Sequence, residues 1–190
     1  LNFCTVDLSA FYFDIRKDSL YCDDKESTKR KSTIKVLNIV LNVLIKWFAP
    51  ILSFTTEEIF KLVNKSADGS IHLKNFPEIK KKWSNLKIKE NWIQIIKIRE
   101  QVNYSIEKKR EEKIVGSSLE ASIKIYMGKN LFNLLKKYDF SEICITSSSE
   151  LILDEKLDGD IKVETNKAEG EKCKVCWKIS KEKCKRHGHL

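Results

Sequence analysis

Apolar residues recur every three or four positions through most of the first 113 residues, and this spacing predicts helices rather than strands. Residues 28–48 give the clearest pattern. One apolar stripe contains Ile34 and Leu41, and a second contains Val40 and Trp47. Two stripes indicate a helix that contacts neighbours on more than one side, as the helices of a bundle do. Similar spacing predicts helices over residues 1–17, after Pro50 and over residues 87–113.

Turn, proline and capping residues mark the predicted ends of these helices. Asp18 and Ser19 predict a turn after the first helix. Pro50 ends the second helix, because proline lacks an amide donor and its ring clashes with the preceding turn. Thr55 and Glu58 have the spacing of a capping box, which places the start of the third helix at Thr55. Residues 64–70 are predicted to form a turn-rich loop, and residues 71–85 an extended or irregular segment.

The pattern changes from helical spacing to alternation after Gly116. Residues 119–127 alternate between apolar and polar side chains, which predicts a strand, and residues 129–138 have the spacing of a short amphipathic helix. Further strands are predicted over residues 141–148, 150–156 and 160–168. Strands and short helices of this kind are typical of a small α/β or α+β module. The whole pattern predicts a mainly α chain with three parts: a helical bundle over residues 1–115, a small α/β module over residues 116–168 and a terminal segment over residues 169–190.

Composition and charge narrow the class of protein. The 190 residues are 42% hydrophobic, which is enough for a real core in one large domain or two small ones. Lys and Arg number 36 against 27 Asp and Glu, a net charge of +9. This excess favours a polyanionic partner, with nucleic acid as the first candidate. The alternative is a lysine-rich surface that serves only solubility.

Several features bear on where the protein is found. The longest apolar stretch is interrupted by lysines and asparagines, which argues against a membrane span, and the first residues lack the pattern of a secretory signal. Cys4, Cys22 and Cys144 are scattered among apolar residues and are predicted to be small buried side chains in a reducing compartment. We therefore expect a cytoplasmic location and no membrane partner. Because the chain begins at Leu1 and its one methionine is Met127, we also expect it to be a piece of a longer protein.

Three cysteines and two histidines lie in the last twenty residues, EKCKVCWKISKEKCKRHGHL. Cys173 and Cys176 are separated by two residues, so one tight turn would present two thiolates to one ion. Cys184 and His187 repeat this spacing, and His189 is a competing fourth ligand. Three sulfurs and one nitrogen suit tetrahedral Zn²⁺, and a site filled by four protein ligands is structural rather than catalytic. The alternative is a disordered basic tail whose cysteines are incidental.

Several segments resemble parts of class I aminoacyl-tRNA synthetases. WFAPILSFTTEEIF, residues 47–60, resembles the signature of the anticodon-binding helical domain of isoleucyl-, valyl- and leucyl-tRNA synthetases, and FYFDIRKDSLY, residues 11–21, is similar to its opening helix. Residues 99–126 resemble the long helix, glycine turn and strand of bacterial isoleucyl-tRNA synthetases, and CKVCW resembles their C-terminal zinc module. The resemblance covers nearly the whole chain in the same order. The chain departs from it at His187, where the family has a cysteine after a longer loop.

The resemblance implies the C-terminal part of a bacterial isoleucyl-tRNA synthetase, an enzyme that joins isoleucine to tRNA(Ile) with ATP. The motifs HIGH and KMSKS, which handle ATP in that family, do not occur in the sequence. No catalytic residue is therefore predicted here, and ATP would bind only a catalytic domain elsewhere in the parent protein. The implied partners are the anticodon arm of tRNA(Ile) and the rest of the synthetase chain, in a monomer. The alternatives are a free-standing zinc-containing RNA-binding protein, the equivalent region of a valyl- or leucyl-tRNA synthetase, and a structural piece whose zinc module docks on the parent.

Charge and position predict which residues contact RNA. The dipole at the start of the helix over residues 28–48 adds to the attraction of its lysines for phosphate. Trp177 lies in a segment with almost no core, so we expect an exposed ring that stacks on a base; a ring packed on the zinc segment is the alternative. The predicted contacts are Lys29, Arg30, Lys31, Lys108, Lys109, Arg110, Lys113, Trp177, Lys178, Lys185 and Arg186. Lysines that are only solvated are the alternative for each. Arg99 interrupts the apolar stripe of its helix, and it either pairs with a buried carboxylate or reaches the nucleic acid.

Overall fold

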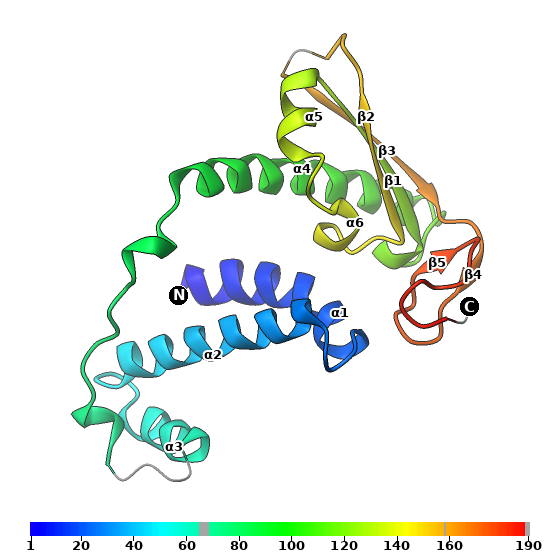
Figure 1. The fold of residues 1–190 in the computed structure, drawn as a ribbon. Helices are drawn as coiled ribbons and strands as arrows, with labels where there is room; N and C mark the ends of the chain where they lie inside the picture. Colours follow the sequence, from blue (N-terminus) through cyan, green and yellow to red (C-terminus); the bar gives the residue numbers. More distant parts are fainter. Residues whose placement is uncertain (65–68, 158, 189–190) are drawn as a thin grey trace. The chain divides into compact units, whose positions relative to one another are not determined.

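The computed structural model describes residues 1–64, 69–157 and 159–188. Figure 1 shows the order of its helices and strands. The helices α1 to α6 span Asp14–Cys22, Thr28–Phe48, Ser53–Val63, Leu86–Glu111, Lys129–Leu135 and Phe140–Ile143. The strands β1 to β5 span Ala121–Met127, Ser148–Leu153, Ile161–Lys167, Glu171–Lys172 and Ile179–Ser180. The chain forms two compact units, a larger one made of Leu1–Asp18 and Asn85–Leu190 and a smaller one made of Ser19–Ser84.

Helices account for most of the regular structure, which confirms the predicted mainly α class with a small α/β part. None of the helices in the described ranges combines the length and the apolarity needed to cross a lipid bilayer. The division into parts over residues 1–115, 116–168 and 169–190 stays a prediction.

The smaller unit contains α2 and α3. α2 begins at Thr28 and ends at Phe48, as predicted, and the Ser27 side chain caps it by accepting a hydrogen bond from the Arg30 amide at 3.4 Å. The apolar core of this unit consists of Ile45, Ala49, Phe60 and Ile71. Between α3 and α4, the described chain is irregular apart from two short 3₁₀ turns, Ile71–Leu73 and Lys81–Trp83. This confirms the irregular segment, while residues 65–68 of the predicted loop lie outside the described residues.

The predicted start of α3 at Thr55 is wrong. α3 begins at Ser53, and Leu52, the residue before it, makes no side-chain cap. The Leu52 amide donates to the Phe48 carbonyl at 2.7 Å across the turn that contains Pro50. The chain therefore re-enters a helix directly from this turn, without the capping box that the sequence suggested.

The first helical stretch is longer than predicted. A π-helical segment, Phe3–Phe13, leads directly into α1, which continues through Asp18 and Ser19 to Cys22. The Ser19 side chain is buried, and the Asp18 carboxylate is bound by the guanidinium of Arg186. Because both polar side chains are accommodated by packing and pairing, they do not end the helix. The turn predicted at Asp18 and Ser19 is therefore wrong.

The larger unit is built around a three-stranded sheet in the order β2-β1-β3. β1 pairs parallel with β2 and antiparallel with β3. The helices α5 and α6 lie between β1 and β2 in the chain, as the crossover of a parallel pair requires. The strands predicted over residues 119–127, 150–156 and 160–168 and the helix predicted over residues 129–138 are confirmed.

One face of β1 supplies much of the core of the larger unit. Its residues alternate between buried and half-buried positions. The buried row of β1 consists of Ala121, Ile123, Ile125 and Met127. The same core contains Ile95, Ile98, Val102 and Ile106 of α4. The hydroxyls of Ser105 and Thr165 lie 2.8 Å apart and add a polar link between α4 and β3.

The strand predicted over residues 141–148 is wrong except at Ser148, where β2 begins. Phe140–Ile143 forms α6. The Asp139 carboxylate accepts hydrogen bonds from the amides of Ser141 at 2.9 Å and Glu142 at 3.4 Å, and so caps a helical turn. Phe140 is fully buried in the core. A local cap and one buried ring thus outweigh an alternation that by itself favours a strand.

Arg99 has its partners inside the larger unit. Its Nε donates to the Ile143 carbonyl at 2.9 Å, and its guanidinium lies 5.2 Å from the ring centroid of Phe11. A terminal nitrogen is 3.9 Å from the Asp14 carboxylate, and the Arg99 side chain is only 18% exposed. Of the two roles left open for Arg99, these contacts support the structural one.

Gly170 occupies a position that other residues do not fit. Its φ is +119°, and a Cβ on this residue would lie 2.1 Å from the backbone oxygen of Ser180. That oxygen belongs to β5, which is hydrogen-bonded to β4. No flexible side chain can therefore move aside to relieve the clash.

We expect Gly170→Ala to destabilise the chain by roughly 1–3 kcal/mol, because the substitution combines an unfavourable backbone conformation with this clash. Urea unfolding followed by tryptophan fluorescence measures the loss. Gly116→Ala is the matched control, since a Cβ there would meet only the flexible Glu120 side chain, at 3.4 Å. Equal stability of the two variants would contradict the assignment.

Candidate metal centre and nucleic-acid interface

The β4–β5 hairpin positions the first pair of candidate metal ligands. Cys173 follows β4, and Cys176 lies in the turn before β5. The Trp177 amide donates to the Cys173 carbonyl at 2.9 Å, and the Cys173 amide donates to the Lys178 carbonyl at 2.9 Å. Trp177 has a φ of +63°. A residue in the left-handed conformation thus closes this tight turn.

A second tight turn carries the other pair. The amides of His187 and Gly188 donate to the Cys184 carbonyl at 3.2 and 2.8 Å. The Cys184 Sγ lies 3.8 Å from the Cys176 Sγ. The His187 Nδ1 lies 3.4 Å from the Cys173 Sγ and 3.2 Å from the Cys184 Sγ. The two turns therefore face each other through their ligand atoms.

These spacings fit one tetrahedral Zn²⁺. Bond lengths of about 2.3 Å to sulfur and about 2.0 Å to nitrogen place two ligand sulfurs about 3.8 Å apart and a sulfur about 3.5 Å from a nitrogen. All the candidate ligand atoms lie within 4.8 Å of one another. The structure thus brings together the predicted set of Cys173, Cys176, Cys184 and His187. His189, the competing ligand, lies outside the described residues.

Backbone amides favour the thiolate form of two of these cysteines. Burial raises the pKa of the Cys173 thiol, but hydrogen bonds from the amides of Cys176 and Val175 outweigh it and lower this pKa to about 6. Burial also raises the pKa of Cys184, and the amides of its own turn bring it below its ordinary value. Burial and the neighbouring thiols raise the pKa of Cys176. By contrast, burial raises the pKa of Cys144 to about 12, which suits its predicted role as a small buried side chain. A thiolate is the form that binds a metal, so the hairpin is prepared for one.

Hydrogen bonds attach the terminal segment to the rest of the larger unit. The Ile179 amide donates to the Ser147 hydroxyl at 2.7 Å, and the Lys178 ammonium donates to the Ser141 hydroxyl at 3.2 Å. Ser141 belongs to α6, and Ser147 directly precedes β2. The segment is an anchored part of the fold, which argues against the alternative of a disordered tail.

Arg186 links the second turn to α1. Its terminal nitrogens donate to both carboxylate oxygens of Asp18, at 2.7 and 2.8 Å, and its side chain acts against the rise in the pKa of Cys176. Contacts of this kind orient the residues that hold a metal. Arg186, a predicted RNA contact, therefore has partners within the protein. No local pattern indicates this pairing, since Asp18 precedes Arg186 by 168 residues.

Trp177 presents most of its ring to solvent, with 59% of the residue exposed. The Lys172 ammonium lies 5.4 Å from the centroid of this ring. Lys185 is also exposed. An exposed ring beside cations suits stacking on a base while the cations contact phosphates. The sequence reasoning missed Lys172, although its position directly before Cys173 would have placed it in the same hairpin.

The other predicted RNA contacts lie at two helix ends. At the start of α2, in the smaller unit, Arg30 donates to the Asp23 carbonyl at 3.0 Å and Lys31 pairs with Glu26 at 2.5 Å. Lys29 in the same turn is exposed. These cations are thus held near the N-terminus of a long helix, where the dipole favours an anion.

The end of α4, in the larger unit, carries the second group. Lys109 and Arg110 each pair with a glutamate three residues away, at 2.7 and 2.8 Å. The Lys108 ammonium lies 4.6 Å from the ring centroid of Tyr104, and Lys113 is exposed. Exposed pairs within one helix contribute little to stability, so these cations can exchange a carboxylate for a phosphate at small cost.

Comparisons with known proteins bear on the role of this surface. A family model described as the anticodon-binding domain of tRNA ligase matches residues 1–125. The isoleucine–tRNA ligase of Pelagibacter ubique is 58% identical over 187 residues, which cover 98% of this chain and 20% of that relative. The isoleucine–tRNA ligase of Agrobacterium fabrum is 42% identical over 189 residues, 95% of this chain and 19% of that relative. The chain thus spans about a fifth of the length of the curated relatives it matches.

The purified chain is expected to carry about one Zn²⁺ per molecule, because its ligand atoms already have tetrahedral spacing. Cys173→Ser should reduce the zinc content nearly to zero. Cys4→Ser, at a half-buried cysteine outside the cluster, is the matched control and should keep its zinc. Elemental analysis by mass spectrometry checks both. Fresh wild-type protein without zinc, or a Cys173→Ser protein that retains it, would contradict the assignment.

Loss of the ion pair between Arg186 and Asp18 should weaken the binding of the metal. We expect Asp18→Asn to release zinc to a chelator roughly tenfold faster, because partners that orient the residues around a metal affect its affinity by about this factor. A chromogenic chelator in a stopped-flow measurement gives the rate. Asp7→Asn, at an exposed aspartate of the π-helical segment, is the control. Identical release from both variants would show that the link does not support the site.

Proposed function

The chain belongs to the family of tRNA-ligase anticodon-binding domains, and on this premise we propose that it holds the anticodon arm of tRNA(Ile) for an isoleucine–tRNA ligase. The observation that carries the proposal is a match of nearly the whole chain to isoleucine–tRNA ligases. The net charge of +9 supports a polyanionic partner of this kind. On this proposal the chain binds and positions RNA, and it carries no catalytic residue.

Two kinds of contact would hold the RNA. The exposed ring of Trp177 stacks on an unpaired base, and Lys172, Lys178 and Lys185 of the same segment contact the flanking phosphates. The helix-end cations contact phosphates of the arm and contribute affinity without reading sequence. Those cations are Lys29, Arg30 and Lys31 at the start of α2, and Lys108, Lys109, Arg110 and Lys113 at the end of α4. Arg186 acts chiefly through its pairing with Asp18 rather than on RNA.

A structural Zn²⁺ would fix the part that carries Trp177. Cys173, Cys176, Cys184 and His187 would hold the ion. When bound, the ion supplies folding free energy to a segment that has few buried side chains of its own. The protein itself positions Trp177, which lies in the turn that Cys173 and Cys176 define.

The reaction itself would occur elsewhere in a longer protein. There, isoleucine would be joined to tRNA(Ile) with ATP, in a cytoplasmic, monomeric enzyme. Apolar side chains of the signature segment support a further contact with the rest of that chain. Ile51 and Phe54 are 74% and 92% exposed, which is unusual for neighbouring large apolar residues. A domain packed on this segment would cover them.

The other functions have less support. Relatives that match across the chain are isoleucine–tRNA ligases, so the equivalent region of a valyl- or leucyl-tRNA synthetase is less favoured. A free-standing zinc-containing RNA-binding protein is disfavoured for the same reason. If the terminal segment is purely structural, deleting residues 171–190 leaves anticodon discrimination unchanged. On our proposal, the same deletion weakens RNA binding.

Binding of tRNA(Ile) transcripts tests the proposal. We expect Trp177→Ala to weaken binding about tenfold, the usual loss when a stacking ring is removed. Trp83→Ala is the matched control, because Trp83 is also half-exposed with a lysine ammonium, Lys80, at 5.8 Å from its ring. Fluorescence anisotropy measures both affinities. Equal losses in the two variants would refute the specific role of Trp177.

The phosphate contacts predict a dependence on salt. Reversing Lys108, Lys109 and Arg110 to glutamate should weaken binding and reduce the slope of log Kd against log salt concentration, because fewer counterions are released. Titrations at several KCl concentrations give this slope. An affinity of the wild-type chain that stays constant from low to high salt would contradict the phosphate-binding role.

A further inference from the structure

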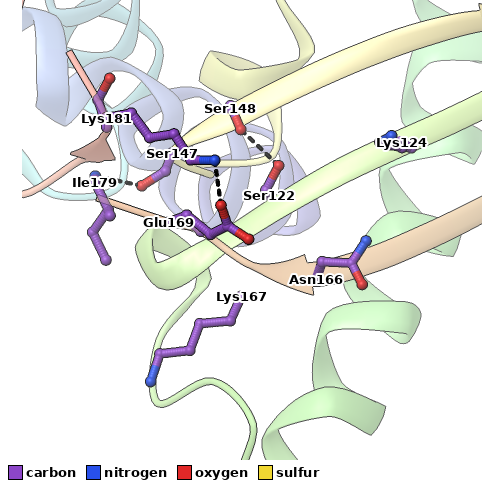
Figure 2. A pocket seen from close by; sticks show the side chains of 11 residues that line it. Ser122, Lys124, Ser147, Ser148, Asn166, Lys167, Glu169, Ile179 and Lys181 are labelled. Atoms are coloured by element: carbon purple, nitrogen blue, oxygen red, sulfur yellow. Dashed lines mark hydrogen bonds and ion pairs between the residues drawn. The ribbon is translucent and has the colours of Figure 1, made fainter. Parts of the chain in front are cut away.

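A hollow lies between the outer face of the three-stranded sheet and the β4–β5 hairpin. Figure 2 shows its lining side chains, which come from the start of β1, the start of β2, the end of β3 and the hairpin. It belongs wholly to the larger unit. The hollow is separate from the metal-ligand cluster, which lies in the turns of the terminal segment.

The register of the sheet forms the floor of this hollow. Ser122 of β1 is paired with Ser148 of β2 on one side and with Asn166 of β3 on the other. Directly paired residues point to the same face of a sheet, so these side chains form one polar row. The row faces away from the core, because Ala121 and Ile123, the neighbours of Ser122, are fully buried on the opposite face. The Ser148 and Ser122 hydroxyls are hydrogen-bonded at 2.7 Å. The Asn166 amide is exposed.

Lysines surround this polar floor. Lys124 is two residues beyond Ser122 on the same face, and Lys181 follows β5 in the hairpin. Each has an exposed carboxylate partner. Lys124 is 3.6 Å from the Glu150 carboxylate, and Lys181 pairs with Glu169 where both side chains are 73% exposed. Exposed pairs of this kind contribute little, so both ammonium groups are available to another anion.

The side chains that line the hollow indicate which kind of ligand it can bind. No aromatic side chain is among the described residues that line the hollow, so it offers nothing on which a base would stack. Ammonium groups suit phosphate, while hydroxyl and amide groups can both donate to and accept from a ribose hydroxyl. A protein tells RNA from DNA through contacts to this 2′-hydroxyl. The lining therefore suits the ribose–phosphate backbone of RNA better than a free base.

The hairpin connects this hollow to the exposed ring of Trp177. Trp177 precedes Ile179, a lining residue, by two positions, which limits the distance between their Cα atoms to about 7 Å. Stacked nucleotides advance by about 3.4 Å each along one strand. A strand whose base stacks on Trp177 would therefore bring its next one or two backbone units to the hollow.

We propose that this hollow binds the ribose–phosphate backbone of the RNA strand whose neighbouring base stacks on Trp177. Lys124 and Lys181 bind successive phosphates of this backbone, and the Ser122–Asn166 row binds the ribose hydroxyl. This inference rests on the proposed function, because it takes the ligand to be RNA. It adds a contact that is independent of sequence and specific for ribose on the sheet itself.

Removing the lysines tests the phosphate contact. In the zinc-loaded 190-residue chain, Lys124→Gln/Lys181→Gln is expected to weaken binding of an anticodon stem-loop RNA about tenfold and to lower the slope of log Kd against log salt by about 1.5. Lys129→Gln/Lys136→Gln removes the same charge at two exposed positions, the first residue of α5 and the residue directly after this helix, and should bind like wild type. Circular dichroism verifies that each variant is folded.

Removing the amide tests the ribose contact. Wild-type protein should bind an all-RNA stem-loop about five- to tenfold more tightly than the same sequence made with 2′-deoxyribose at the nucleotides that flank the stacked base. Asn166→Ala should reduce this preference at least threefold and leave the salt slope unchanged. Asn130→Ala, at an exposed asparagine of α5, is the control and should keep the preference.

The outcomes separate this inference from the proposed function. If wild type binds RNA but the lysine and asparagine variants behave like their controls, the hollow is not a backbone site, while the proposed function stands. If wild type binds no RNA at any salt concentration, both fail. If all lysine substitutions, controls included, weaken binding equally, the effect is one of net charge and the hollow has no specific role.

Discussion

The apolar core that the buried row of β1 shares with α4 is the feature on which the rest of the larger unit depends. β1 is the central strand of its sheet and is paired on both sides, so its position fixes β2 and β3 as well. Because Ile123 and Ile125 lie in this core, the alternate residues Ser122 and Lys124 must face outward. The polar face of the sheet is thus a consequence of its apolar face. The terminal hairpin is then anchored next to the start of β2, through the Ser147 hydroxyl.

The order of the terminal segment has a different physical basis. It is too short to build a core, and on the proposed function its order depends on a metal held by ligand atoms that converge with the spacing of a tetrahedral ion. Backbone amides stabilise the thiolate of Cys173, while Arg186 connects the cluster to Asp18 of α1. This construction allows Trp177 to remain exposed, since the ring is not needed as a core residue. An exposed aromatic ring on a rigid turn is what recognition of an unpaired base requires.

Patterns over short stretches of sequence predicted the features that depend only on residues close together in the chain. The periodicity of residues 28–48, the alternation along β1 and the paired two-residue spacings of the metal ligands each correspond to the structure. The strand predicted in place of α6 is wrong because one side chain, Asp139, caps four residues whose alternation looked extended. The Asp18–Arg186 pair and the row across Ser122 depend on residues far apart in the chain, so no local pattern indicates them. The sequence also does not indicate which exposed lysines contact RNA, because all lysines have the same chemistry until their neighbours in the structure are known.

On the proposed function, this chain binds one region of a transfer RNA through an aromatic ring and cations, while the chemistry is performed elsewhere in a longer protein. Hydroxyl-radical footprinting of tRNA(Ile) with the zinc-loaded chain tests this binding, because it reports which riboses the protein covers. We expect protection confined to the anticodon loop and its adjoining stem. Protection concentrated on the acceptor stem, or spread evenly over the molecule, would contradict this assignment.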